Sequence, residues 1–318
     1  MRIGAIDCGT NSIRLLIADV ERTDSGVQLT DVTRVMRIVR LGEGVDANGV
    51  FSEGALERTF TAVREYAQIL EQYPVQSLRF GATSATRDAR NRDIFLDGIE
   101  RILGVRPEVI SGDEEAALSF AGALLALGGS EENTVVVDLG GGSTEFVLGN
   151  SADGVVAARS MNIGCVRLTE RYAVDSTVSA DQRESIIADV DAAIDGAAER
   201  VDFSSARALV GVAGTVTTLT AHALGLPSYD SERINRTYLA EAQTAASAIA
   251  LAGMSREQRE NLGYMHPGRV DVIGTGVLIW SRIVERLQEL SGGAIAGATT
   301  SEHDILDGLV LSQYSAGE

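Results

Sequence analysis

Two segments of the sequence, 131 positions apart, place an acidic residue before a run of small glycine and hydroxyl residues. They are Asp7-Cys8-Gly9-Thr10-Asn11-Ser12 and Asp138-Leu139-Gly140-Gly141-Gly142-Ser143. Small residues let backbone N–H groups approach a phosphate, while carboxylates such as Asp7, Asp138 and Glu145 can hold a hard divalent cation. One such segment alone is more typical of an ordinary hairpin cap. Two copies favour phosphate chemistry with Mg²⁺ or another divalent cation.

Glu115 is the strongest candidate for a catalytic group. It lies in Ser111-Gly112-Asp113-Glu114-Glu115-Ala116, at the start of an expected helix. Acidic residues are common in a first helical turn because they complement the helix dipole, and Glu114 can be explained in this way. A glutamate buried near phosphate oxygens would instead have a raised pKa, suited to taking a proton from an attacking water. Such a glutamate would make the protein a hydrolase, and Glu115 is the candidate for its base; the helix-start explanation fits Glu115 equally well on composition alone.

The basic counterpart is the segment that contains Arg87, Arg90 and Arg92, at an expected junction between a strand and a helix. Guanidinium groups bind phosphate through paired hydrogen bonds, and the free N–H groups of a helix start add a second anion site. Arg90 and Arg92 are also compatible with a solvated surface. Arg87 is the predicted phosphate-binding arginine.

Composition excludes several other classes of function. The net charge of −18 disfavours binding to nucleic acid, and the 27 basic residues are all Arg, so no lysine chemistry is available. The three histidines lack metal-ligand spacing, which argues against zinc. Cys8 and Cys165 stand far apart, so we expect no disulfide framework. We therefore expect a cytoplasmic location. The longest uncharged stretch, 208–229, is too rich in Gly, Pro, Ser and Thr for a membrane span.

The candidate residues are positioned by an alternation of strands and helices that predicts an α/β fold. In the first half, strands are expected at 3–7, 13–20, 76–82 and 107–110, with a further strand or two between the second of these and Val39. Helices are expected at 53–73, 93–103 and 113–127. In the second half, strands are expected at 134–138, 155–161 and 208–212, followed by helices at 179–200, 239–251, 255–262 and 270–290, a short Ala-Gly strand and a terminal helix at 301–315.

Dense Gly and polar punctuation at 128–133 predicts a hinge between two domains. The 318 residues also suit two domains of ordinary size. We expect a first domain at 1–127 and a second at 128–300, with the terminal helix at 301–318 packing back on the first. The repeated acid-tipped hairpins indicate that the two halves are homologous.

Seven ordered motifs resemble those of the exopolyphosphatase and guanosine pentaphosphate phosphohydrolase family, within the actin-like, sugar-kinase and heat-shock ATPase superfamily. The motifs are Ile6–Ser12, Ala82–Arg87, Ile110–Ala116, Val137–Glu145, Gly164–Thr169, Gly211–Thr217 and Pro267–Ile273. The resemblance implies two ribonuclease-H-like (actin-like ATPase) domains with an interdomain cleft. It also implies a homodimer and Mg²⁺-dependent hydrolytic release of terminal orthophosphate from inorganic polyphosphate.

The same resemblance assigns roles to individual residues. Glu115 would be the catalytic base, Asp138 and Glu145 would position metal and water, and Arg87 would hold phosphate. The remaining predicted phosphate-binding residues are Asn11, Ser12, Gly140, Gly141, Gly142, Ser143, Gly214 and Thr215, and Asp7 joins the predicted metal ligands. Longer members carry an additional helical region; this chain resembles the short two-domain type, for which we expect a preference for short polyphosphate.

Two other functions remain compatible with these residues. The nearest is removal of the 5′ γ-phosphate of guanosine pentaphosphate. An ATP-binding actin-like kinase or module is the second, because paired loops of this type also suit the phosphates of ATP.

Overall fold

A computed structural model describes residues 1–23, 26–127 and 132–314 of the chain. The chain divides into two compact units: unit 1 contains Met1–Gly122 and Ile305–Glu318, and unit 2 contains Ala123–Asp304. The predicted hinge segment at 128–133 lies mostly outside the described residues.

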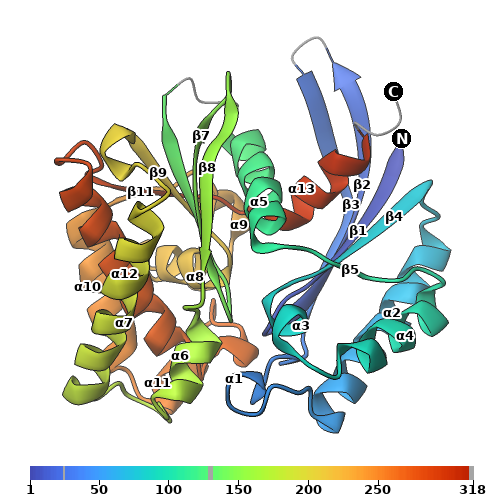
Figure 1. Ribbon diagram of the computed structural model, residues 1–318, viewed down its shortest axis with the longest axis horizontal. Helices are drawn as coiled ribbons and strands as arrows, with labels where there is room; N and C mark the ends of the chain where they lie inside the picture. The colour runs from blue at the N-terminus through green and yellow to red at the C-terminus, as the bar shows by residue number, and fades with distance from the viewer. Residues whose placement is uncertain (24–25, 128–131, 315–318) are drawn as a thin grey trace. The chain divides into compact units, whose positions relative to one another are not determined.

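Unit 1 is built on a five-stranded mixed sheet with the order β3-β2-β1-β4-β5 (Figure 1). The strands are β1 Arg2–Cys8, β2 Ser12–Thr23, β3 Gly26–Ile38, β4 Ser77–Ala82 and β5 Glu108–Val109. The first three strands form an antiparallel meander, and β4 and β5 then add parallel to β1. The three parallel strands therefore end at one edge of the sheet.

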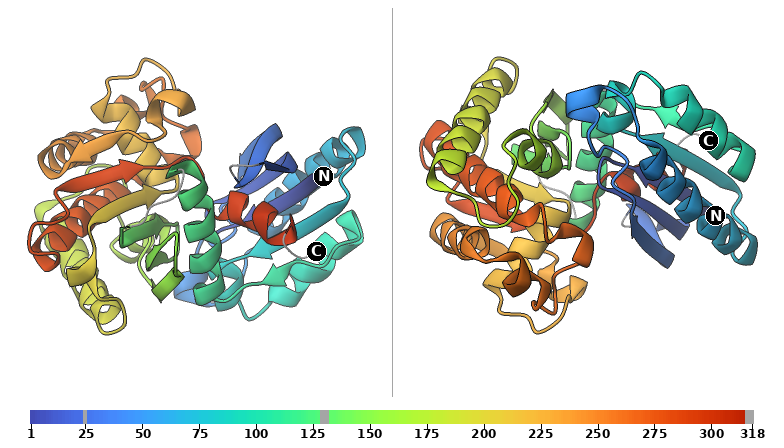
Figure 2. Two further views of the ribbon diagram at one scale, coloured as in Figure 1. Left: turned by 90° about the horizontal axis from the view of Figure 1, so that it is seen from above. Right: turned by 90° about the horizontal axis from the view of Figure 1, so that it is seen from below.

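Helices cover both faces of this sheet. On one face, Ile6 and Cys8 pack in a core with α2 (Glu53–Gln72) and α4 (Arg92–Leu103). On the other face, Ile3 and Ala5 pack with α5 (Gly112–Leu127) and α13 (Ile305–Tyr314); α13 is the red helix crossing the blue strands in Figure 2. Because strand residues alternate between faces, Asp7 lies on the face covered by α5 and α13.

Unit 2 repeats this topology on a six-stranded sheet with the order β10-β11-β9-β6-β7-β8. The strands are β6 Thr134–Leu139, β7 Thr144–Asn150, β8 Gly154–Met161, β9 Ala208–Val212, β10 Tyr238–Ala240 and β11 Gly297–Thr300. Strands β6, β7 and β8 form the antiparallel meander, and β9 and β11 continue the sheet parallel to β6. Only β10 has no counterpart among the described strands of unit 1.

The main core of unit 2 lies on one face of its sheet. Val135 and Val137 of β6 contribute to it, as do α7 (Ala180–Ala198), α8 (Gly214–Ala223), α10 (Glu241–Gly253) and α12 (Ile273–Leu290). Alternation along β6 places Asp138 on the opposite face. The remaining helices are short: α1 Val45–Asn48, α3 Ser84–Asp88, α6 Cys165–Arg171, α9 Ser231–Ile234, α11 Arg256–Glu260 and the 3₁₀ turns Phe203–Ser205 and Pro267–Arg269.

The predicted α/β class with two sheets is confirmed, and most expected elements are present within a few residues. The further strand or two expected through Val39 is the single strand β3. Three helix starts differ. Residues 238–240 pair with β11, so the helix expected from 239 begins at Glu241. A 3₁₀ turn precedes the helix expected from 270, which begins at Ile273. The terminal helix, expected from 301, begins at Ile305. In the first two cases strand pairing or turn formation takes the place of the first helical residues.

Both cysteines are buried and neither forms a disulfide within the described part of the chain. Among the helices that the structure describes, none combines the length and apolarity needed to cross a bilayer.

Candidate active site

Three loops meet at the carboxyl edge of the unit 1 sheet because the strands before them are parallel and in register. Asp7 lies beside Gly81, and Ala82 lies beside Val109. The loop after β4 is tied to β1 by a hydrogen bond from the Thr83 N–H to the Cys8 carbonyl, 3.1 Å long. Ligands of α/β sheets bind at this kind of edge. The fold thus brings together the three predicted segments that contain Asp7, Arg87 and Glu115.

Glu115 and Arg87 form a direct ion pair at this edge. The Arg87 Nη1 donates to Glu115 Oε2 at 2.6 Å and to the Ile110 carbonyl at 3.0 Å. The Glu115 side chain is only 10% exposed and that of Arg87 is 24% exposed. Arg87, predicted as a phosphate ligand, therefore also contacts the predicted base.

The environment raises the pKa of Glu115 to about 7. Burial is the main cause, because a charged carboxylate loses hydration inside the protein. The charge and hydrogen bond of Arg87 oppose this effect, the nearby charge of Asp7 adds to it, and a hydrogen bond with Thr83 lowers the pKa. A glutamate with a pKa near neutrality can both accept and release a proton at physiological pH.

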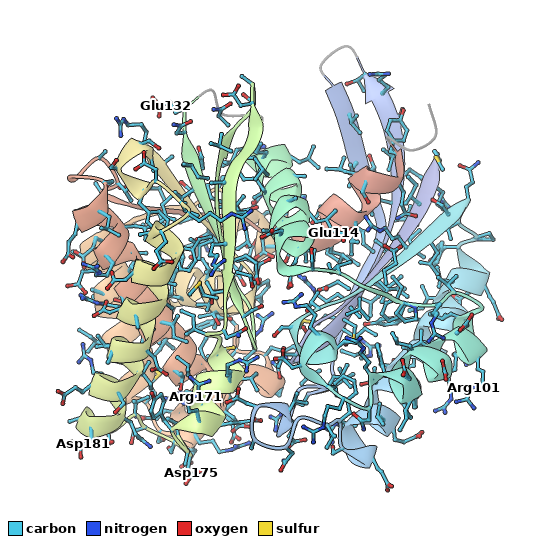
Figure 3. The ribbon with its side chains drawn as sticks, in the orientation of Figure 1. Arg101, Glu114, Glu132, Arg171, Asp175 and Asp181 are labelled. Carbon is cyan, nitrogen blue, oxygen red and sulfur yellow. The ribbon has the colours of Figure 1, made fainter. Side chains whose placement is uncertain are left out.

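The neighbouring Glu114 has a different environment. It is 43% exposed and forms an ion pair with Arg79, and Figure 3 shows it on α5. Its backbone N–H donates to the Ser111 hydroxyl at 3.1 Å, so the Ser111 side chain caps the start of the helix. Glu114 therefore has the exposed position expected of a helix-start acid, whereas Glu115 has the buried position expected of a catalytic group. The catalytic role itself stays a prediction.

Asp7 faces an arginine that sequence reasoning did not select. Arg14 lies directly opposite Asp7 in the β1–β2 ladder and donates to its Oδ2 from Nε at 3.1 Å and from Nη2 at 2.7 Å. Arg14 occupies the same place in the first hairpin as Glu145 in the second, because the two positions are separated by the repeat offset of 131 residues. Comparing the two repeats position by position could have revealed this reversal of charge.

The second hairpin instead places two carboxylates opposite each other. Asp138 and Glu145 are register partners in the β6–β7 ladder and are 6% and 1% exposed. Ser160 of β8 donates to Glu145 Oε1 at 2.7 Å. Two buried carboxylates on one face repel each other unless a cation or proton offsets their charge. Sequence reasoning did not select Ser160.

The chemistry of this pair suits a hard divalent cation. Mg²⁺ is commonly bound through one or two carboxylates and takes its other ligands from water and phosphate oxygens. Within the residues described, no group of three or more His, Cys, Asp or Glu is arranged to hold a metal. The paired carboxylates of Asp138 and Glu145 have the chemistry that Mg²⁺ requires, and the roles of Asp7, Asp138 and Glu145 as metal ligands stay predictions.

The two glycine-containing loops form equivalent turns at the tips of the hairpins. The Gly9 N–H donates to the Ser12 carbonyl at 2.9 Å, and the Gly140 N–H donates to the Ser143 carbonyl at 3.0 Å. These hydrogen bonds place Asn11 at the carboxyl edge of the unit 1 sheet and Gly141 and Gly142 at that of the unit 2 sheet.

The loop after β9 lies at the same carboxyl edge of the unit 2 sheet as the Gly140–Ser143 loop. Gly214 and Thr215 begin helix α8 there, beside the strand that bears Asp138. The Arg269 guanidinium lies against Gly214: a Cβ on this glycine would be 2.3 Å from Arg269 Cζ. Arg269 also donates to the Thr218 hydroxyl at 3.2 Å. Sequence reasoning placed Arg269 in a motif but not in the site.

Each unit thus collects its predicted site residues at one sheet edge. In unit 1 these residues are Asp7, Asn11, Ser12, Arg87 and Glu115; in unit 2 they are Asp138, Gly140, Gly141, Gly142, Ser143, Glu145, Gly214 and Thr215. The structure adds three residues that contact these predicted site residues: Arg14, Ser160 and Arg269.

Comparisons with known proteins identify the family. The chain is 46% identical over 316 residues to "Exopolyphosphatase 2" of Mycobacterium tuberculosis, covering 98% of each protein. It is 33% identical over 309 residues to "Guanosine-5'-triphosphate,3'-diphosphate pyrophosphatase" of Aeromonas salmonicida, covering 94% of this chain and 60% of that protein.

Solved structures agree with this relationship. An exopolyphosphatase-like protein is 44% identical with a TM-score of 0.93, covering 99% of both chains. The Aquifex aeolicus PPX-GPPA enzyme is 26% identical with a TM-score of 0.79, covering 98% of this chain and 99% of that one. A sequence model of the Ppx/GppA phosphatase family matches residues 18–313. The chain therefore belongs to the Ppx/GppA phosphatase family, as its sequence motifs predict.

Proposed function

We propose that this chain is an exopolyphosphatase, which hydrolyses the terminal phosphoanhydride bond of inorganic polyphosphate and releases orthophosphate. The observation that supports hydrolysis is the buried Glu115, which has a pKa of about 7 and is paired with Arg87. Polyphosphate as substrate is supported by the 46% identity, over almost the whole of both chains, to a protein named exopolyphosphatase.

Glu115 acts as the general base in this proposal. It takes a proton from a water molecule while the water oxygen attacks the terminal phosphorus. The bond from that phosphorus to the bridging oxygen breaks, and the shortened chain leaves with the electron pair. Arg87 keeps Glu115 oriented and offsets negative charge that develops on the phosphoryl oxygens.

Unit 2 supplies groups that bind phosphate and metal. The Gly140–Ser143 loop offers backbone N–H groups, and Asp138 and Glu145 would hold Mg²⁺. When bound, the ion supplies positive charge that neutralises phosphate oxygens. The Ser160 hydroxyl orients the Glu145 carboxylate through its 2.7 Å hydrogen bond. The net charge of −18 makes this neutralisation more important, because the protein as a whole repels a polyanion.

The test compares two neighbouring glutamates in the full chain. Glu115→Gln should lower orthophosphate release from polyphosphate by about 10²- to 10⁴-fold, the usual contribution of a general base. Glu114→Gln is the matched control, because Glu114 is exposed and bound to Arg79. The proposal fails if the folded Glu115→Gln protein retains wild-type activity, or if the wild-type protein releases no orthophosphate from polyphosphate.

We also propose a preference for short polyphosphate. Within each unit, the phosphate-binding groups assigned above are confined to loops at one edge of the sheet, so each set can contact only a few phosphates. The measurement compares initial rates per enzyme on chains of a few and of several hundred phosphates. Equal rates at matched concentrations of chain ends would remove this preference and leave the exopolyphosphatase assignment intact.

Hydrolysis of guanosine pentaphosphate is the second candidate function. It is favoured by the 33% identity to the Aeromonas salmonicida protein, although this chain covers 60% of that protein. Orthophosphate release from guanosine pentaphosphate and from polyphosphate should be compared on one preparation. A higher kcat/KM on the nucleotide would make it the preferred substrate.

A further inference from the structure

The carbonyl groups of the Gly140–Gly142 loop are held by the start of helix α6. The Gly140 carbonyl accepts from the Cys165 N–H at 3.1 Å, and the Gly141 carbonyl accepts from the N–H groups of Val166 and Arg167 at 2.9 and 3.0 Å. The Gly142 carbonyl accepts from the Arg167 side chain, through Nε, at 2.6 Å. Three consecutive carbonyls therefore point toward α6.

This arrangement determines where the loop N–H groups point. In a trans peptide the C=O and the following N–H are directed to opposite sides, and the described residues contain no cis peptide. The N–H groups of Gly141, Gly142 and Ser143 are consequently directed away from α6. No hydrogen bond joins these three N–H groups to another residue in the described part of the chain. Successive N–H groups aimed to one side form an anion-binding concavity.

Close backbone contact reinforces the arrangement. Gly164, the residue before α6, lies against the loop so closely that a Cβ there would be 2.5 Å from the Gly141 carbonyl carbon and oxygen and 2.7 Å from the Gly142 nitrogen. The preceding residue is anchored as well, since the buried Thr144 hydroxyl donates to the Ile163 carbonyl at 2.8 Å. The loop and the start of α6 are therefore fixed together.

The first repeat achieves the same result with main chain alone. The Asn11 carbonyl accepts from the N–H groups of Val39 and Arg40 at 3.0 and 2.9 Å, and the Thr10 carbonyl accepts from the Gly42 N–H at 2.9 Å. Asn11 corresponds to Gly142, because the same repeat offset of 131 residues separates them. In unit 2 the guanidinium of Arg167 holds the carbonyl that two backbone N–H groups hold in unit 1.

We propose that Arg167 is a positioning residue for phosphate binding. By holding the Gly142 carbonyl toward α6, it aims the Ser143 N–H at a phosphate bound by the loop. The bond is charge-assisted and short, so it restricts rotation of the peptide between these residues. This inference rests on the proposed function, because it assigns to the loop the phosphate of the same substrate.

The test uses two variants that disturb the loop in different ways and one matched control. Arg167→Ala removes the guanidinium, whereas Gly164→Ala retains every charge and forces the loop away from α6. Arg171→Ala is the control, because Arg171 lies one turn later on α6 (Figure 3) and binds Asp189 rather than the loop. Tripolyphosphate binding is measured by calorimetry in the Glu115→Gln background, where hydrolysis is suppressed.

We expect Arg167→Ala and Gly164→Ala each to weaken tripolyphosphate binding by about 10- to 100-fold, the effect of losing a hydrogen bond to a charged group. Arg171→Ala should bind within about twofold of the parent protein. In the active background, a misaimed loop raises KM for polyphosphate, whereas partial unfolding lowers apparent kcat and leaves KM unchanged. If Arg167→Ala does not fold, Arg167→Lys takes its place and should still weaken binding severalfold.

Two results would overturn the proposal. One is tripolyphosphate binding by Arg167→Ala that equals that of Arg171→Ala. The other is normal binding by Gly164→Ala together with weak binding by Arg167→Ala, which would mean that Arg167 acts through its charge and not through the loop. Because binding is measured without turnover, both results remain interpretable even if the wild-type protein fails to hydrolyse polyphosphate.

Discussion

Replacing Arg87 with methionine should change the pH at which the enzyme becomes active. Arg87 and Glu115 are 2.6 Å apart, and burial raises the pKa of Glu115 to about 7 while the arginine holds it down. Methionine has a similar length and no charge, so Arg87→Met leaves the effect of burial almost unopposed. The pKa of Glu115 should therefore rise further.

The size of the effect follows from the geometry of the pair. An opposite charge at this separation lowers the pKa of a carboxyl group by about 1 to 3 units. At an effective dielectric constant of about 20, two unit charges about 4 Å apart interact by about 4 kcal/mol, which is an upper bound of about three pKa units. Because Arg87 is 24% exposed, solvent screens part of this interaction, and the lower half of the range is expected.

The assay is kcat/KM for orthophosphate release, measured from about pH 5 to about pH 10. A general base must be deprotonated, so activity is lost as pH falls through the pKa of Glu115. The wild-type profile should have an acidic limb with a midpoint of about 7. Arg87→Met should move that midpoint by about 1 to 2 pH units toward alkaline pH and also lower the maximum rate. Arg79→Met, which removes the partner of the exposed Glu114, should leave the midpoint in place.

Two results would refute this reasoning. If Arg87→Met lowers the rate but leaves the midpoint unchanged, Arg87 does not control the ionisation of the base. If the acidic limb persists at about pH 7 in Glu115→Gln, another group produces it. Thermal unfolding of each variant shows whether the fold is retained.

The remaining predictions concern the unit 2 carboxylates and the core beneath them. Glu145→Gln should abolish most activity at low Mg²⁺, and Ser160→Ala, which removes the hydrogen bond to Glu145, should raise the Mg²⁺ concentration for half-maximal activity by about 10-fold. A metal titration of activity measures both, and an unchanged titration for Glu145→Gln would exclude it as a ligand. Gly211→Ala should lower the free energy of unfolding by about 1 to 3 kcal/mol, because the new methyl group would meet the Trp280 ring at 2.5 Å. Urea unfolding measures this loss, and wild-type stability would show that the ring can move aside.

Much of the local structure could be predicted from sequence because its causes are local. The apolar run that ends at Asp7, the turn residues after it and the next apolar run specify a hairpin by themselves. The helix at Glu53–Gln72 was expected at 53–73, since its apolar residues recur at helical spacing. The repeat of the acid-tipped hairpins likewise predicted two copies of one fold, which the two sheets show.

The chemical state of the site depended on tertiary structure. Burial and neighbouring charge set the pKa of Glu115, and its partner Arg87 lies 28 residues away in the sequence. Parallel strands bring their loops together at one sheet edge, and no local pattern specifies which strands become neighbours. For the same reason, the contact of Arg269 with Gly214 appeared only in the folded chain, whereas the ion pair of Arg14 with Asp7 lies within one hairpin and could have been found by comparing the two repeats. Residue type and spacing determined which groups could do phosphate chemistry; long-range packing decided which of them are buried, paired and correctly aimed.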